Sequence, residues 1–178
     1  MVRCRLIALT IALSALSLAT VGAPAVAQDP LAGFADSLTT LPEPGTLTQR
    51  GTIYVPAYAA IRAGGGKTRI DLATTLGIHN TAEDKALVIE RIDYFETSGK
   101  LVQTYLAKPV AVRPLGTIEI FVAREDTRGG TGANFLVGWA AAGPIAEPLI
   151  ETVMIGSVGN TSYSFVSQGR PVRPAGMR

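Results

Sequence analysis

One loop gathers the residues that are best placed to bind a ligand. The segment EDTRGGTGAN (residues 125–134) holds two acidic residues, an arginine and three glycines. Glycine permits tight backbone reversals, and an aspartate can accept hydrogen bonds from amides two or three residues further on. We therefore predict that Asp126 closes a turn and that Arg128 is exposed and able to meet an anion. The ligand-binding candidates are Asp126, Arg128, Asn134 and Glu151.

This loop does not match the motifs that bind phosphate groups. A P-loop needs a lysine and a helix after its glycines, whereas GGTGAN is followed by an apolar segment that we predict to be a strand. The helix dipole that attracts anions is then missing. The GGGK segment at residues 64–67 fails for the same reason. Both segments are interpreted mainly as turns.

The residue types of common catalytic and metal sites are scarce. His79 is the only histidine, and no G-x-S-x-G motif offers a serine nucleophile. The single cysteine, Cys4, lies near the N-terminus. The acidic pairs at residues 83–84 and 125–126 lack the alternating spacing of a calcium loop. We therefore predict no catalytic residue, no metal site and no cofactor.

Most of the chain after residue 50 shows the two-residue alternation of β-strands. Apolar residues alternate in RIDLATTLGI (69–78), TIEIFV (117–122) and LIETVMIGSV (149–158), and segments containing glycine or proline separate such runs. Eight or nine short strands with almost no helix are expected. The prediction is an all-β fold, specifically an immunoglobulin-like antiparallel β-sandwich.

Two segments give more detailed expectations. In ALVIERIDYF (86–95), Leu87 and Ile89 have one phase, whereas Ile92 and Tyr94 have the other. One extra residue near positions 90 and 91 would return both pairs to the core, which predicts a β-bulge. The segment ANFLVGWA (133–140) is apolar on both faces, as in a central strand covered on both sides. We expect its Trp139 to lie in the core.

The N-terminal segment has the parts of a signal peptide. Two arginines precede an apolar run, and AVA at residues 25–27 fits the small-x-small cleavage rule. We expect a signal peptide at 1–27, an extended leader at 28–50, the β-sandwich domain at 51–172 and a flexible tail at 173–178. The protein would be periplasmic or extracellular, with no transmembrane span after cleavage. The alternative is an uncleaved anchor, although the run is short for a span of about 20 residues.

The charge balance excludes one class of partner. The formal charge is +2, but without Arg3 and Arg5 the 16 basic residues fall to 14, equal to the 14 acidic residues. A nearly neutral protein has no field that would attract nucleic acid. Because Cys4 lies in the predicted signal peptide, the mature chain would have no disulfide, and its stability would come from packing.

Six motifs resemble, in order, the bacterial domain of unknown function 3124 family. They are YVPAY (54–58), LATTLGIHNT (72–81), IDYFETSGKLVQTYL (92–106), DTRGGTGANFLVGW (126–139), EPLIETVMIG (147–156) and SFVSQGR (164–170). The match covers residues 51–172. The resemblance implies an exported or envelope-associated bacterial protein and implies no activity. Many members have a lipid-attachment cysteine at the cleavage site, which this chain lacks, and an arginine often replaces His79.

The sequence therefore favours a binding or structural function over an enzymatic one. The leading hypothesis is a non-enzymatic module of the cell envelope that binds an unidentified protein, glycan or small ligand through loops or a sheet edge. Two alternatives stay open. One is a hydrolase that uses the carboxyl groups of Asp126 and Glu151 as acid and base, and the other is a periplasmic metal-handling protein.

Overall fold

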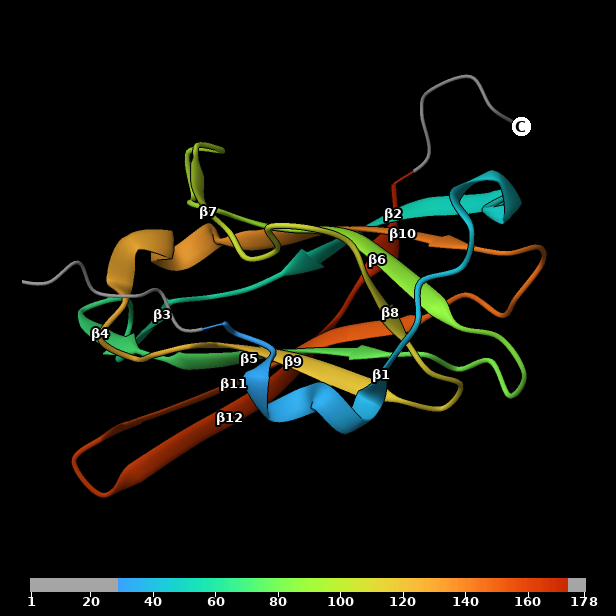
Figure 1. The fold of residues 1–178 in the computed structure, drawn as a ribbon. Helices are drawn as coiled ribbons and strands as arrows, with labels where there is room; N and C mark the ends of the chain where they lie inside the picture. Colours follow the sequence, from blue (N-terminus) through green and yellow to red (C-terminus); the bar gives the residue numbers. More distant parts are fainter. Residues whose placement is uncertain (1–28, 173–178) are drawn as a thin grey trace, which may run out of the picture.

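The computed structural model describes residues 29–172 of the 178-residue chain. Within them the chain forms thirteen β-strands and three short 3-10 helices (Figure 1). The predicted signal peptide and C-terminal tail lie outside the described residues. Among residues 29–172, no helix combines the length and the apolar character that a membrane span requires.

The larger sheet is antiparallel and has seven strands. Its order is β1-β8-β6-β10-β2-β13, and β7 also pairs with β6. The strands are β1 (Leu38–Thr39), β2 (Gln49–Pro56), β6 (Leu87–Phe95), β7 (Leu101–Thr104), β8 (Val110–Val112), β10 (Asn134–Ala141) and β13 (Arg170–Pro171). β10 lies between β2 and β6, as expected for its apolar sequence.

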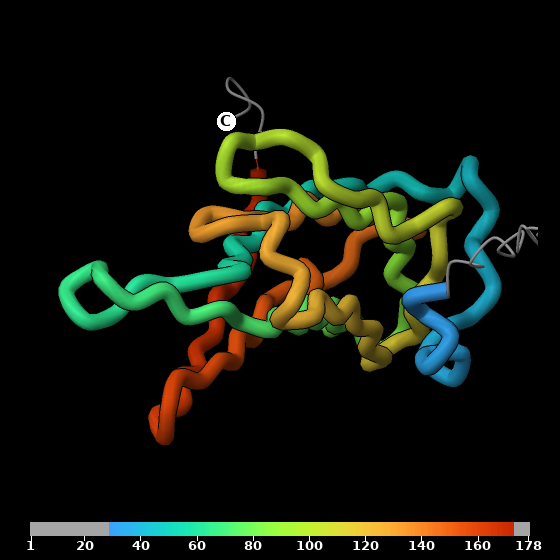
Figure 2. The backbone as a smooth tube through the Cα atoms, turned by 90° about the vertical axis from the view of Figure 1, so that its left-hand side faces the viewer, coloured from blue at the N-terminus to red at the C-terminus, as the bar shows by residue number. Residues whose placement is uncertain are grey.

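The smaller sheet is also antiparallel and has four strands, in the order β12-β11-β5-β9. They are β5 (Ala73–His79), β9 (Thr117–Val122), β11 (Leu149–Val158) and β12 (Thr161–Gln168). A separate hairpin joins β3 (Ala60–Ala63) to β4 (Thr68–Asp71). This hairpin and the β11–β12 hairpin project from the same side of the molecule (Figure 2).

The main hydrophobic core lies between the two sheets. Phe135, Val137 and Trp139 of β10 are buried together with Leu76 of β5 and Ile92 of β6. Alternate residues of β10 reach this core, because successive side chains of a strand point to opposite faces. The predicted position of Trp139 is therefore confirmed.

The predicted β-bulge is present in β6. Arg91 pairs with Gly138 of β10 and Ile89 pairs with Trp139, so Glu90 is the extra residue. Leu87, Ile89, Ile92 and Tyr94 are all buried in one cluster as a result. The change of hydrophobic phase in the sequence thus located the irregularity to within one residue.

The structure confirms the all-β class and the two antiparallel sheets, but it does not show an immunoglobulin-like topology. It also has more strands than the eight or nine expected. The additional ones, β1, β3, β4 and β13, have four residues or fewer. β1 and β13, with two residues each, carry too few alternating positions for a clear periodic signal. β4 instead belongs to the alternating run 69–78, which the fold divides at Leu72.

The segment expected to be an extended leader is packed against the domain. It contains η1 (Ala32–Ser37), β1 and η2 (Pro44–Thr46), and β1 pairs with β8. Leu31 is buried in the main core, with Phe34 packed against it. Burial of Leu31 and Phe34 is favourable because it removes apolar surface from water, whereas Leu41 of the same segment stays exposed.

Candidate functional site

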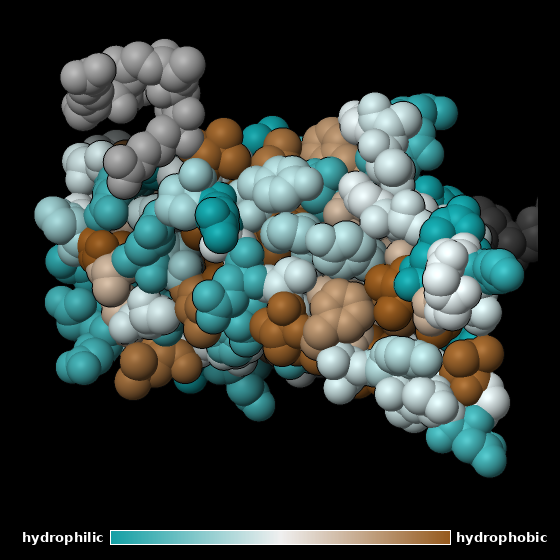
Figure 3. Space-filling model, turned by 180° about the vertical axis from the view of Figure 1, so that it is seen from behind, coloured by the Kyte–Doolittle hydropathy of each residue, from teal (hydrophilic) through white to brown (hydrophobic). Residues whose placement is uncertain are grey.

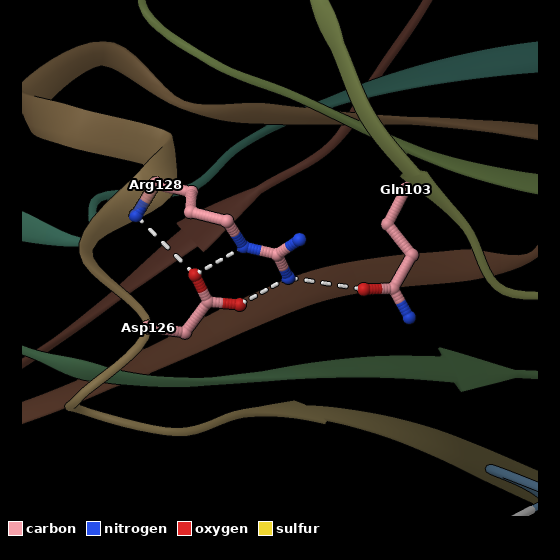
Figure 4. A network of polar contacts seen from close by, with 3 residues as sticks. All are labelled: Gln103, Asp126 and Arg128. Atoms are coloured by element: carbon pink, nitrogen blue, oxygen red, sulfur yellow. Dashed lines mark hydrogen bonds and ion pairs between the residues drawn. The ribbon is translucent and has the colours of Figure 1, made fainter. Parts of the chain in front are cut away.

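The predicted site loop contains η3 (Thr127–Gly132), which begins after Asp126. One carboxylate oxygen of Asp126 accepts hydrogen bonds from the Arg128 amide at 3.2 Å and from Arg128 Nε at 2.7 Å. The other accepts from Arg128 Nη2 at 2.6 Å, and Nη2 also donates to Gln103 Oε1 at 3.1 Å (Figure 4). The predicted aspartate turn is therefore confirmed, and Arg128 closes it with a two-pronged ion pair.

Their contact keeps Asp126 negatively charged and Arg128 positively charged. Hydrogen bonding from the Arg128 side chain lowers the pKa of Asp126 below its ordinary value, and the same contact raises the pKa of Arg128. A carboxyl group with a lowered pKa stays ionised near neutral pH, so Asp126 is a poor proton donor. Because its charge is balanced locally, Arg128 presents less net charge to an anion than we expected.

Two tyrosines adjoin the pair. Burial, with the negative charge of Asp126 as the second cause, raises the pKa of Tyr94 to about 12. Burial also raises the pKa of Tyr105. Both phenols therefore keep their protons at neutral pH. The rings pack on Phe135, with centroid distances of 4.8 Å for Tyr94 and 6.1 Å for Tyr105.

The glycines of the loop differ in backbone conformation. The left-handed conformation belongs to Gly130, with φ of 72°, and not to Gly132. Thr97 holds the turn, because its hydroxyl donates to the Gly129 carbonyl at 3.0 Å and accepts from the Gly132 amide at 2.9 Å. The loop is thereby fastened to the β6–β7 connection.

The other two candidates lie on strands β10 and β11. Asn134 is the first residue of β10 and faces Pro56 and Phe95 in the sheet. Glu151 lies on β11 opposite Gly77 and Gln168. Its neighbours in sequence, Ile150 and Thr152, are buried, so strand alternation directs Glu151 to the outer face of the four-stranded sheet. Of the four candidates, the described hydrogen bonds join only Asp126 and Arg128.

His79 also has a local partner. Its Nδ1 lies 2.9 Å from the Thr117 hydroxyl on the neighbouring strand β9. In residues 29–172 no three His, Asp or Glu side chains are grouped so that they could hold a metal ion.

A groove that we did not predict lies on the outer face of the seven-stranded sheet. Its volume is about 430 Å³, and its walls come from the leader, β2, β6 and the segment before β8. The lining residues are Leu41, Pro42, Glu43, Pro44, Leu47, Arg50, Val88, Glu90 and Pro109. Most of this surface is apolar, and its charged groups are Glu43 and the ion pair between Arg50 and Glu90.

The β-bulge contributes directly to this groove. Val88 is buried on the outer face, together with Ala111 and Ala140, and Leu47 of the leader packs against them. The extra residue of the bulge, Glu90, lines the groove together with Val88 and pairs with Arg50. The leucines and prolines of the leader could have indicated this site. A segment that is fully solvated would leave such apolar residues exposed to water, so their presence favours packing against the sheet.

Comparison with known proteins identifies a family for this chain. The sequence model of a family described as "Protein of unknown function (DUF3124)" matches residues 50–172. The chain belongs to the DUF3124 family. This confirms the resemblance inferred from the six motifs.

The DUF3124 match covers the strands from β2 to β13 and leaves out most of the leader that lines the groove. Among curated proteins, none matches the chain. The crystal structure of Thermotoga maritima 1070 is similar over 67% of this chain and 92% of its own, with 13% identity and a TM-score of 0.40.

Proposed function

We propose that this DUF3124 protein is a non-enzymatic binding module of the bacterial envelope, and that the groove beside the leader holds its ligand. The observation that carries the proposal is an apolar groove of about 430 Å³ that has an ion pair in its wall. Small-molecule sites usually have 300–1,000 Å³ and combine apolar walls with a few polar groups. The ligand would be a small, partly apolar molecule with a polar group near Arg50 and Glu90.

The state of the loop favours binding over catalysis. Asp126 is held ionised by Arg128, and Tyr94 and Tyr105 keep their protons near neutral pH. General acid–base catalysis needs groups that exchange protons near the working pH. The hydrolase with Asp126 and Glu151, and the metal-handling protein, gain no comparable support. Export to the periplasm or beyond is part of the proposal and depends on the N-terminal sequence.

The experiment uses two leucines with nearly equal exposure. Leu41 is 46% exposed and lines the groove, whereas Leu101 is 48% exposed and lies on β7. Protein purified from the native envelope would be analysed by native mass spectrometry for a bound small molecule. Binding of anilinonaphthalene sulfonate, an aromatic dye with one negative charge, would be titrated in parallel. We expect Leu41→Asp to lose the bound molecule and most dye binding, and Leu101→Asp to retain both.

Equal loss in the two variants would show that the groove has no special role. Equal retention of binding in the two variants would also count against the groove. An aspartate at position 41 places a charge against the apolar wall and should disrupt a ligand bound there. An Arg50→Ala variant then separates the apolar from the polar contribution. It should weaken binding of a charged ligand while leaving a neutral apolar probe bound.

The immunoglobulin-like relationship is also kept as a proposal. Two strand pairs support it: β6 pairs with β10 in one sheet, and β5 pairs with β9 in the facing sheet. The positions of β2 beside β10 and of β11 beside β5 would then be the departures from that fold.

A further inference from the structure

Apart from β12, the edge strands of the two larger sheets are short or covered, and β7, which pairs only with β6, has four residues. The seven-stranded sheet ends at β1 and β13, which have two residues each. The four-stranded sheet ends at β9, along which η1 packs (Figure 1), and at β12. Natural proteins shorten or cover sheet edges in these ways because unpaired edges recruit other strands. β12 is the exception.

β12 is long and lacks every usual protection. It has eight residues, TSYSFVSQ, with no charge, no proline and no glycine. Within residues 29–172 its only strand partner is β11. Tyr, Phe, Val and Thr are favourable in strands. A charged side chain or a proline would normally discourage pairing at such an edge.

The register shows which amides of β12 face outward. Gly169, just after β12, donates its amide to the Ile150 carbonyl of β11 at 2.8 Å. Antiparallel bonding alternates along a strand, so the odd-numbered residues of β12 direct their amides to β11. The amides of the even-numbered residues then point outward. These residues are Ser162, Ser164, Val166 and Gln168.

We propose that β12 pairs with β12 of a second copy of this chain. The two strands would run antiparallel about a two-fold axis and join the four-stranded sheets into one sheet of eight strands. A two-fold interface uses the same patch on both copies. This inference does not depend on the groove, which lies on the other sheet.

The distribution of charge favours a second copy as the occupant. β12 carries no charged residue, so antiparallel self-pairing brings no like charges into contact along its length. Near the β11–β12 turn, Arg124 donates to the carbonyl of Ser157, the partner of Ser162. The other two charges are Glu151, which pairs with Gln168, and Arg170, which follows the strand. Both lie at the same end of β12. Antiparallel pairing places the two copies of each charge at opposite ends of the interface.

The side chains on this edge also suit a self-contact. Val166 is 54% exposed and lies in the middle of the outward-facing row. In the view from behind, the side that carries the β11–β12 hairpin is mostly pale or brown, and strongly hydrophilic residues gather at its tip (Figure 3). Pairing would partly cover Val166 with the small serines of the other copy.

The test is the oligomeric state of the purified protein. Sedimentation velocity over a wide range of concentrations should show a species with twice the monomer mass. Ser164→Pro removes one outward amide and leaves the bonds to β11 in place, so it should give a monomer. Ser164→Lys places a charge on the same edge and should do likewise. Circular dichroism checks that both variants are folded.

Phe121→Lys is the matched control. Phe121 is 64% exposed on the other edge strand, β9, and points to the same outer face. This variant should remain a dimer. In wild-type protein, hydrogen exchange of the amides of Ser162, Ser164 and Val166 should slow as the dimer forms.

Several outcomes would overturn the proposal. One is a wild-type protein that stays monomeric at every concentration. Another is a dimer that survives both Ser164 variants, and a third is a dimer that Phe121→Lys dissociates, because the face and not the edge would then be the interface. Dye binding in the groove is expected to be unchanged in the monomeric variants.

Discussion

The tight packing beneath Tyr94 gives the most specific stability prediction. Gly129 is buried in the loop, and its carbonyl accepts hydrogen bonds from the Thr97 amide and hydroxyl, both at 3.0 Å. A Cβ atom at Gly129 would overlap the Tyr94 hydroxyl and lie 2.7 Å from the Ala133 Cβ. Gly129→Ala therefore forces a methyl group into occupied space.

The expected cost can be estimated from two opposing effects. Overpacking a well-filled site costs about 1–3 kcal/mol. Gly129 does not have a positive φ, so alanine brings no backbone strain and lowers the entropy of the unfolded chain, which stabilises by about 0.4–1 kcal/mol. The net loss in the free energy of unfolding should be about 1–2 kcal/mol. Because the Tyr94 hydroxyl is the nearest obstacle, Tyr94→Phe should recover part of this loss.

The assay is a double-mutant cycle measured by chemical denaturation. The wild-type protein, Gly129→Ala, Tyr94→Phe and the double variant would be compared, with Gly33→Ala as the control because no heavy atom lies within 4 Å of its Cβ position. Strictly additive effects, within about 0.5 kcal/mol, would refute the proposed contact. So would a Gly129→Ala protein as stable as the wild type.

Three further predictions concern the core, the ion pair and the bulge. Trp139→Ala should cost about 3–5 kcal/mol in thermal or chemical unfolding, and Trp139→Phe clearly less, because the buried Nε1 has no partner among the described residues. The pKa of Asp126 is lowered from its ordinary value of 3.8, so its charge stabilises the folded protein fully at pH values above 3.8. This stabilisation is lost as the pH falls through the lowered pKa. The stability difference between wild type and Asp126→Asn, below about 1 kcal/mol for so exposed a pair, should therefore shrink in acid. Deleting Glu90 should abolish cooperative unfolding, whereas Glu90→Ala should preserve it, since only the deletion moves half of β6 out of phase.

The sequence predicted those features that depend on local periodicity. The phase change between Ile89 and Ile92 located the bulge, because each side chain of a strand has only two possible directions. The apolar run around Trp139 identified a central strand for the same reason. These features need little knowledge of distant residues.

The features that the sequence did not predict depend on contacts between distant segments. The run RIDLATTLGI alternates without a break, yet it is divided at Leu72, whose amide donates to the Ala59 carbonyl. The groove forms between the leader and the distant residues Val88 and Pro109. No local sequence pattern predicts that these segments lie close together. The loop glycines could not be told apart, since the positive φ at Gly130 follows from how Thr97 fastens the turn.

The pairing of β2 has a consequence for the order in which the chain folds. β2 begins at Gln49, but both of its strand neighbours, β10 and β13, come from beyond residue 133. Its buried residues Ile53 and Val55 therefore have no sheet to join until most of the chain has been synthesised. Contacts between residues so far apart in sequence make folding slow. The domain should consequently fold late and all at once, and a chain truncated before β10 should leave β2 exposed to aggregation.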